Sequence, residues 1–192
     1  MPWDILIRNA RILDGSGRAA SAGEIGVRGE KIGFVGASCT GAASLTIDVG
    51  GMAVCPGFID MHTHNDFLLL GDGAGVSKLR QGVTTILVGQ CGISAAPIRD
   101  ERVSLLDAYT GFIRAGVTPE WNWRSFAEYL DVLDGLDLGL NVGSFVGHGT
   151  IRLNVLGFEN RLPAPDELRE MREMARTALE EGAFGMTSGL IY

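Results

Sequence analysis

Two histidines stand two positions apart in the segment GFIDMHTHND, residues 57–66. The segment ends an apolar stretch that we interpret as a strand over residues 53–61. Alternate residues of a strand point to the same side, so His62 and His64 are expected to project together. Two neutral imidazoles side by side suit zinc or a similar ion. Two solvent-exposed histidines are the alternative, but the chain has only three, and finding two of them here favours a metal site.

A third candidate ligand, Cys91, follows the next apolar stretch, Val83–Gly89. Active sites of barrel enzymes lie where the carboxyl ends of parallel strands meet, so the thiol is expected beside the two imidazoles. A thiolate there can ligate one zinc ion or bridge two. A buried structural cysteine is the alternative, and the histidine pair on the adjacent strand favours the ligand.

Three further residues are candidates for contacting a substrate or orienting a ligand. Asp66 fits two roles equally, because a carboxylate can orient a ligating histidine or cap a helix. His148, in VGHGT, fits three roles equally: a hydrogen bond to a metal ligand, a contact with the substrate or a structural hydrogen bond. Tyr192, in TSGLIY, either offers its hydroxyl to a substrate or packs at the rim of the fold. No residue of the chain is assigned as catalytic.

Two differently built regions must position these residues. Residues 1–52 are expected to form a small β domain, with a hairpin around Gly29 and Glu30 and short strands over 4–9, 11–13 and 45–48. Residues 53–192 alternate between predicted strands and helices. The strands are expected over 53–61, 83–89, 138–146 and 183–191, and the helices over 73–81, 100–115, 126–133 and 165–181.

This alternation predicts an α/β fold with parallel strands, either a (β/α)8 barrel or a doubly wound sheet. No GxGxxG or P-loop follows a strand, which removes the usual reason to prefer a nucleotide-binding sheet. The region is short beside the ~250 residues of a typical barrel. We therefore predict the first half of a TIM-like barrel, about four βα units.

Composition narrows the classes of partner. The net charge of −7 argues against nucleic acid and anionic membranes. No apolar run approaches the ~20 residues that span a bilayer, and the N-terminus MPWDILIRNA does not have the pattern of a signal peptide. The three cysteines form no CxxC pair, so we expect a reducing, cytoplasmic setting.

The segments DILIRNARILDGSG, PGFIDMHTHND, GVTTILVGQCGISAAP, NVGSFVGHGTIR and GAFGMTSGLIY occur in this order. Together they resemble the D-aminoacylase family (N-acyl-D-amino-acid deacylases) of the amidohydrolase superfamily, along the whole chain. The resemblance implies a small β domain on a distorted barrel. It also implies His62, His64 and Cys91 as ligands of one or two zinc ions. Asn65 stands where a second acidic residue is expected, and Gln90 where asparagine is more usual.

The activity implied by the resemblance is zinc-dependent hydrolysis of a small N-acyl-D-amino acid to a carboxylate and a D-amino acid. It also implies histidine ligands from a fifth and a sixth strand and an acid/base aspartate from an eighth. We therefore expect the 192 residues to be an incomplete portion of the enzyme. Such a portion is expected to be inactive and prone to self-association through exposed half-barrel edges.

Two alternatives remain open at this point. The first is a cyclic-amide hydrolase of the dihydroorotase or hydantoinase type, which the histidine pair alone would also suit. That class typically uses a carboxylated lysine at a later strand end, and the chain has only Lys31 and Lys78, neither at such a position. The second alternative is a non-catalytic metal-binding fragment.

Overall fold

The computed structural model describes residues 2–71, 73 and 75–190. The chain divides into two compact units, Met1–Pro56 and Gly57–Tyr192. Tyr192, a candidate substrate contact, lies outside the described residues. Within the described part of the chain, no helix has both the length and the hydropathy needed to cross a bilayer.

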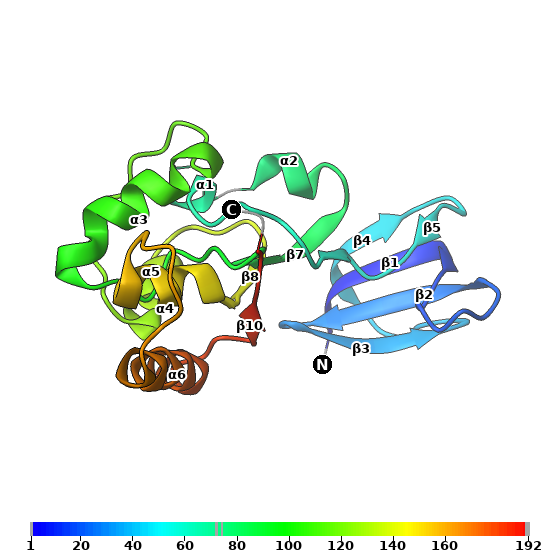
Figure 1. The fold of residues 1–192 in the computed structure, drawn as a ribbon. Coiled ribbons are helices and arrows are strands. Elements are labelled where there is room, and N and C mark those ends of the chain that lie inside the picture. The colour runs from blue at the N-terminus through cyan, green and yellow to red at the C-terminus, as the bar shows by residue number, and fades with distance from the viewer. Residues whose placement is uncertain (1, 72, 74, 191–192) are drawn as a thin grey trace. The chain divides into compact units, whose positions relative to one another are not determined.

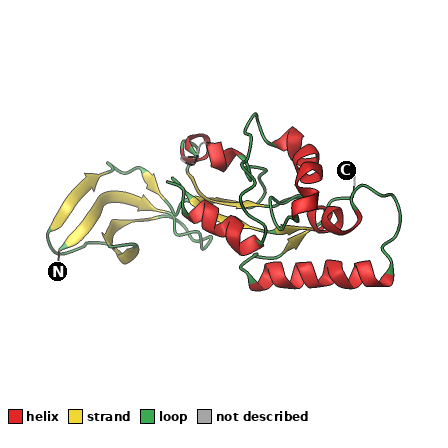
Figure 2. Ribbon diagram, turned by 90° about the vertical axis from the view of Figure 1, so that its left-hand side faces the viewer, coloured by secondary structure: helices red, strands yellow, loops and turns green. Residues whose placement is uncertain are grey.

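The first unit consists of strands and loops, with no helix among its described residues (Figure 2). Its sheet has the order β3-β2-β1-β4, and β5 pairs with β1 (Figure 1). The hairpin predicted around Gly29 and Glu30 is confirmed, because β2 and β3 pair antiparallel on either side of this turn. The strands are β1 (Trp3–Ile12), β2 (Ser21–Arg28), β3 (Lys31–Gly36), β4 (Ala43–Asp48) and β5 (Ala53–Val54).

Two strand predictions in this region were wrong. Residues 4–13 do not form two strands; β1 continues through a shift of register between Ile7 and Ala10. Asn9 has a φ of 55°, so it marks a bulge within the strand and not its end. The strand expected over 53–61 is also interrupted, because β5 pairs with β1 and a proline, which lacks an N–H, follows at position 56. Residues 53–56, expected to open the second domain, therefore belong to the first unit.

The second unit alternates strands with helices and is a mixed α/β structure (Figure 1). Its strands are β6 (Phe58–Asp60), β7 (Val83–Val88), β8 (Asn141–Ser144), β9 (Val146–Gly147) and β10 (Met186–Thr187). Its α-helices are α1 (Leu68–Gly71), α2 (Val76–Leu79), α3 (Val103–Thr110), α4 (Phe126–Asp134), α5 (His148–Leu156) and α6 (Pro165–Glu180). Two 3-10 turns, η1 (Asp100–Arg102) and η2 (Gly111–Ile113), flank α3.

Parallel pairing brings the candidate ligand segments to one edge. Strands β6, β7 and β8 form a parallel sheet in that order, and β9 pairs parallel with β10. A backbone hydrogen bond of 2.9 Å from Phe184 to Ser144 extends the contacts between the two sheets. Because β6 and β7 are parallel neighbours, the segments that follow them begin at the same edge of the sheet, where the carboxyl ends of the strands lie.

Several predicted elements are shorter in the structure. The strand over 138–146 is split at Phe145 into β8 and β9. Of the strand over 183–191, the residues described up to 190 form only the two-residue β10. Of the helix over 73–81, α2 covers Val76–Leu79. Helix α5 was not predicted, because glycines on both sides of His148 are typical of a loop. The helices over 126–133 and 165–181 are confirmed, the first starting with a Ser125–Glu128 capping box.

An apolar and aromatic core supports the ligand segments of the second unit. Phe67, Phe126 and Tyr129 are fully buried, and the rings of Trp123 and Tyr129 pack with centroids 5.5 Å apart. The hydroxyl of Tyr129 donates a hydrogen bond of 3.1 Å to the backbone carbonyl of Asp66. Helix α4 is thereby tied to the chain just after the histidine pair.

Candidate metal centre

His62 and His64 lie in the loop that follows β6, because the strand ends at Asp60. The alternation of side chains along a strand, which predicted their proximity, therefore does not account for it. Their ring centroids are 5.7 Å apart, with the planes at 70°. A backbone hydrogen bond of 3.4 Å from Thr63 to Leu87 connects this loop to β7. His62 is exposed, whereas His64 is half-buried.

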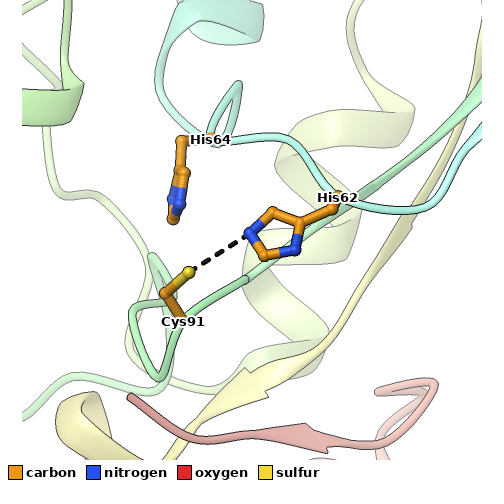
Figure 3. Close-up of side chains that lie close together, drawn as sticks. All are labelled: His62, His64 and Cys91. Atoms are coloured by element: carbon orange, nitrogen blue, oxygen red, sulfur yellow. Dashed lines mark hydrogen bonds between the residues drawn. The ribbon is translucent and has the colours of Figure 1, made fainter. Parts of the chain in front are cut away.

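Cys91 lies in a tight loop at the end of β7. Gly89, Cys91 and Gly92 have φ values of 76°, 56° and 78°. This left-handed region costs a residue with a Cβ roughly 1–2 kcal/mol, so Cys91 adopts it against its own preference. At Gly89 a Cβ would lie 2.1 Å from the carbonyl oxygen of Phe145, so only glycine fits. The backbone turn directs the thiol of Cys91 towards the histidine loop (Figure 3).

The three predicted ligands converge. Nε2 of His62 lies 3.2 Å from Sγ of Cys91, and the ring of His64 lies beside them (Figure 3). One ligand atom from each of the three residues lies within 4.8 Å of the others. In the part of the chain that the structure describes, no other group of His, Cys, Asp or Glu side chains meets this geometric condition.

The donor set suits zinc. Nitrogen and sulfur ligands of one tetrahedral zinc ion lie about 3.6 Å apart, close to the 3.2 Å between His62 and Cys91. Nδ1 of His64 is buried without a hydrogen-bond partner, which is a costly state for a polar atom. Burial, and to a lesser extent the nearby His62, lowers the pKa of His64. The imidazole is thus kept in the neutral form that binds metals.

Asp66 is fully buried beside the centre. Its Oδ1 accepts a hydrogen bond of 2.7 Å from the backbone N–H of Gly89, while Oδ2 is buried without a partner. Burial raises the pKa of this carboxyl to about 7. The hydrogen bond to Gly89 is neither of the two contacts that the sequence suggested. It joins the segment that carries His64 to the loop that carries Cys91.

His148 is the first residue of α5 and is not one of the three converging side chains. It lines a cleft of about 350 Å³, to which Gly149 and Gly189 also contribute. These two glycines lie against the cysteine loop, since a Cβ at Gly92 would be 2.8 Å from the nitrogen of Gly189 and 3.4 Å from that of Gly149. The structure therefore places His148 at a cleft that adjoins the cysteine loop.

Sequence reasoning missed how two polar side chains hold the ligand loops. The carboxylate of Asp60, just before the histidine loop, lies 2.6 Å from Nζ of Lys78. Gln90 was noted only because it stands where asparagine is more usual, and it is buried. The available signal was a polar residue in an apolar stretch, close in sequence to a ligand.

Comparison with known proteins identifies the family. The amidohydrolase family profile matches residues 45–190. The chain is 35% identical over 195 residues to the D-aminoacylase of Alcaligenes xylosoxydans xylosoxydans. This alignment covers 100% of the present chain and 38% of the relative, so the chain spans less than half of the relative's length.

Solved structures agree with this assignment. A D-aminoacylase with a binuclear metal centre is 34% identical and has a TM-score of 0.87, with coverage of 100% of this chain and 39% of that one. The N-acyl-D-glutamate deacylase of Bordetella bronchiseptica, solved with zinc and a phosphonate inhibitor, is 32% identical, with a TM-score of 0.86 and the same coverage of 100% and 39%. The chain therefore belongs to the amidohydrolase family, and the resemblance to its D-aminoacylase branch that the sequence motifs indicated is confirmed.

Proposed function

We propose that the second unit contributes part of the zinc centre of an enzyme that hydrolyses N-acyl-D-amino acids to a carboxylate and a D-amino acid. The convergence of His62, His64 and Cys91 carries this proposal. The similarity to D-aminoacylases supports the substrate class, and the zinc in the B. bronchiseptica deacylase supports the choice of metal.

Each ligand has a distinct part in this centre. Zinc held there would supply Lewis acidity towards the amide carbonyl and would activate water at neutral pH. His62 and His64 would bind as neutral imidazoles, and the lowered pKa of His64 favours that state. Cys91 would bind as the thiolate.

The decisive assay uses the complete gene product, because the chain spans 38% of the D-aminoacylase relative. We expect hydrolysis of N-acetyl-D-methionine that is lost with a chelator and restored by zinc. Cys91→Ala is expected to lower kcat/KM by more than about 100-fold. Cys55→Ala, which removes another free cysteine, is the matched control and should leave the rate unchanged. Full activity in Cys91→Ala would exclude this metal centre.

The 192 residues by themselves are proposed to lack this activity. The resemblance implies further ligands and an acid/base aspartate from later strands, and a proton donor to the leaving nitrogen is required for amide cleavage. The test is the purified 192-residue chain with zinc and N-acetyl-D-methionine. Release of D-methionine above the chelated control would contradict the proposal.

Cyclic-amide hydrolysis is disfavoured by the position of the lysines. Lys78 lies on α2 with its Nζ 2.6 Å from the carboxylate of Asp60, and Lys31 begins β3 in the first unit. Neither is placed as the carboxylated lysine that this class typically uses. Faster hydrolysis of hydantoin than of N-acetyl-D-methionine by the complete gene product would reverse this choice.

We also propose that the parallel strands of the second unit belong to a (β/α)8 barrel. Large apolar side chains are exposed on the short strands of the second unit. The exposed fractions are 57% for Phe58 and 60% for Ile59 on β6, and 54% for Met186 on β10. Exposed apolar strands favour association, so self-association of the isolated chain stays a prediction. A monomer at all concentrations in light scattering would count against it.

A further inference from the structure

The peptide group between Met61 and His62 is held at both of its polar ends by side chains. Its carbonyl oxygen accepts a hydrogen bond of 2.8 Å from Nε2 of Gln90. Its N–H donates a hydrogen bond of 3.1 Å to Oδ1 of Asp60. Since β6 ends at Asp60, this peptide lies beyond the strand pairing, and the two side chains take the place of sheet hydrogen bonds.

Gln90 also connects this peptide to the strand that leads to Cys91. Its amide nitrogen lies 3.2 Å from the carbonyl oxygen of Leu87, so it donates to both carbonyls. Gln90 is only 6% exposed, and loss of its amide would leave the Leu87 carbonyl and the Met61 carbonyl without this donor. Because Cys91 is the next residue, one side chain spans from the backbone of one ligand to that of another.

The other end of the peptide is anchored independently. Oδ2 of Asp60 accepts a hydrogen bond of 2.6 Å from Nζ of Lys78 on α2. The backbone of His62 is therefore fixed to α2 through Asp60 and to β7 through Gln90. Gln90 thus adds a side-chain contact between the backbone before His62 and the cysteine loop, beside the backbone hydrogen bond from Thr63 to Leu87.

We propose that Gln90 is a positioning residue of the metal centre, which sets the separation of His62 and Cys91 by bridging the carbonyls of Met61 and Leu87. The inference rests on the proposed metal centre and adds to it a residue that does not touch the metal. Loss of a residue that orients a ligand typically costs 10–100-fold in metal affinity. Removing the donor is therefore expected to weaken zinc binding while the chain remains folded.

Gln90→Met tests this, because it keeps the length of the side chain and removes the donor. Its matched control is Gln81→Met, since Gln81 donates a hydrogen bond of 2.9 Å to the carbonyl of Ser77 at an exposed position. Zinc affinity of the 192-residue chain is measured by competition with a chromophoric chelator. Thermal melts without metal report folding, and the sulfur-to-cobalt charge-transfer band with Co²⁺ reports the thiolate contact.

We expect Gln90→Met to bind zinc about 10–100-fold more weakly and to show a weakened charge-transfer band. Gln81→Met should match the wild type in both. Gln90→Asn keeps a donor on a shorter side chain and should bind more tightly than Gln90→Met. The band and this partial rescue distinguish positioning from a general loss of stability.

Wild-type affinity and an unchanged band in folded Gln90→Met would overturn the positioning role and leave the metal centre intact. Absence of zinc binding in the wild type would instead remove the proposed function. Should Gln90→Met not fold, Gln90→Leu, which also lacks the donor, decides: weaker binding than the wild type supports the role, and equal binding overturns it.

Discussion

Two groups of glycines, one in each unit, serve different purposes. In the first unit, the ring of Trp3 lies across Gly26 and Gly33, where an added Cβ would meet ring atoms at 2.9 and 2.8 Å. In the second unit, glycines of the ligand loop meet backbone. A Cβ at Gly89 would lie 2.1 Å from the carbonyl oxygen of Phe145. One set of glycines accommodates a side chain, and the other allows two backbone segments to touch.

The difference bears on where the molecule is rigid. A side chain can rotate away from an added methyl group, although Trp3 is restrained by a hydrogen bond of 3.0 Å to the carbonyl of Thr40. Phe145 lies between β8 and β9, so its carbonyl cannot move without disturbing the paired residues on either side. The backbone around Gly89 therefore has little room to move, next to the residues that must be placed accurately for metal binding.

The largest effect is expected from Gly89→Ala. The new Cβ meets the Phe145 carbonyl, and the φ of 76° is unfavourable for alanine. We expect a loss of roughly 3 kcal/mol or more in the free energy of unfolding, together with weaker zinc binding. Urea denaturation and chelator competition measure the two quantities. A variant that unfolds and binds zinc like the wild type would contradict the comparison.

A smaller effect is expected from Thr150→Val, which keeps the shape of a buried side chain of the second unit. The Thr150 hydroxyl donates to the carbonyl of Ser94 and accepts from its N–H, both at 2.9 Å. Leaving these groups unpaired costs about 2 kcal/mol. Thr46→Val on exposed β4 is the matched control and should change stability little. Equal melting temperatures of the two variants would show that the two hydrogen bonds between Thr150 and Ser94 do not contribute to stability.

Gly26→Ala probes the side-chain use of glycine. Displacing the ring of Trp3 is expected to cost about 1 kcal/mol, because the ring gives up its hydrogen bond to Thr40 and its contact with Arg28, whose guanidinium carbon lies 4.3 Å from the ring centroid. Zinc affinity should not change. Urea denaturation and chelator competition measure the two quantities for this variant. A loss of unfolding free energy as large as that of Gly89→Ala would remove the contrast between the two groups of glycines.

The smallest effect on stability is expected at Glu167, which lies on the first turn of α6 in the second unit. Arg161, followed by the N–H of Ala164, lowers the pKa of this carboxyl from 4.5 to about 2. A folded-state pKa below the unfolded value stabilises the fold above pH 4.5, and the benefit disappears as the pH falls towards 2.

Glu167→Gln should therefore lower the melting temperature by no more than about 4 °C at pH 7. The difference from the wild type should shrink when both are melted at progressively lower pH. A constant difference across this range would assign the effect to something other than the charge. Zinc affinity should be unchanged in this variant. That result would show that a substitution in the second unit does not affect metal binding merely because it lies in that unit.

The sequence predicts the kinds of elements better than their extents. The helix over 165–181 is recovered because its apolar spacing reports one buried face directly. The stretch over 53–61 is mostly apolar and was predicted as one strand, yet β5 and β6 lie in different units. Apolar character does not reveal which strand supplies the hydrogen-bond partners. Extents depend on tertiary pairing, which a local pattern does not contain.

The candidate site divides in the same way. His62, His64 and Cys91 could be selected because residue type and position at the end of a predicted strand both point to a metal. The contacts of Gln90 could not, because they depend on a separation of 29 residues in the chain being closed to 2.8 Å. The left-handed backbone of Cys91 is similarly invisible in a sequence, since cysteine has no preference for it.

A shared ion between His62 and Cys91 would act as a reversible cross-link. These residues are 29 positions apart, so the ion would close the intervening chain into a ring that contains α1 and α2. Closing a ring of this size restricts an unfolded chain by about 3–4 kcal/mol in the chain-entropy treatment used for disulfides. Unlike a disulfide, this restraint would follow the supply of free metal, so chelation should loosen residues 62–91 before it affects the helices further along the chain.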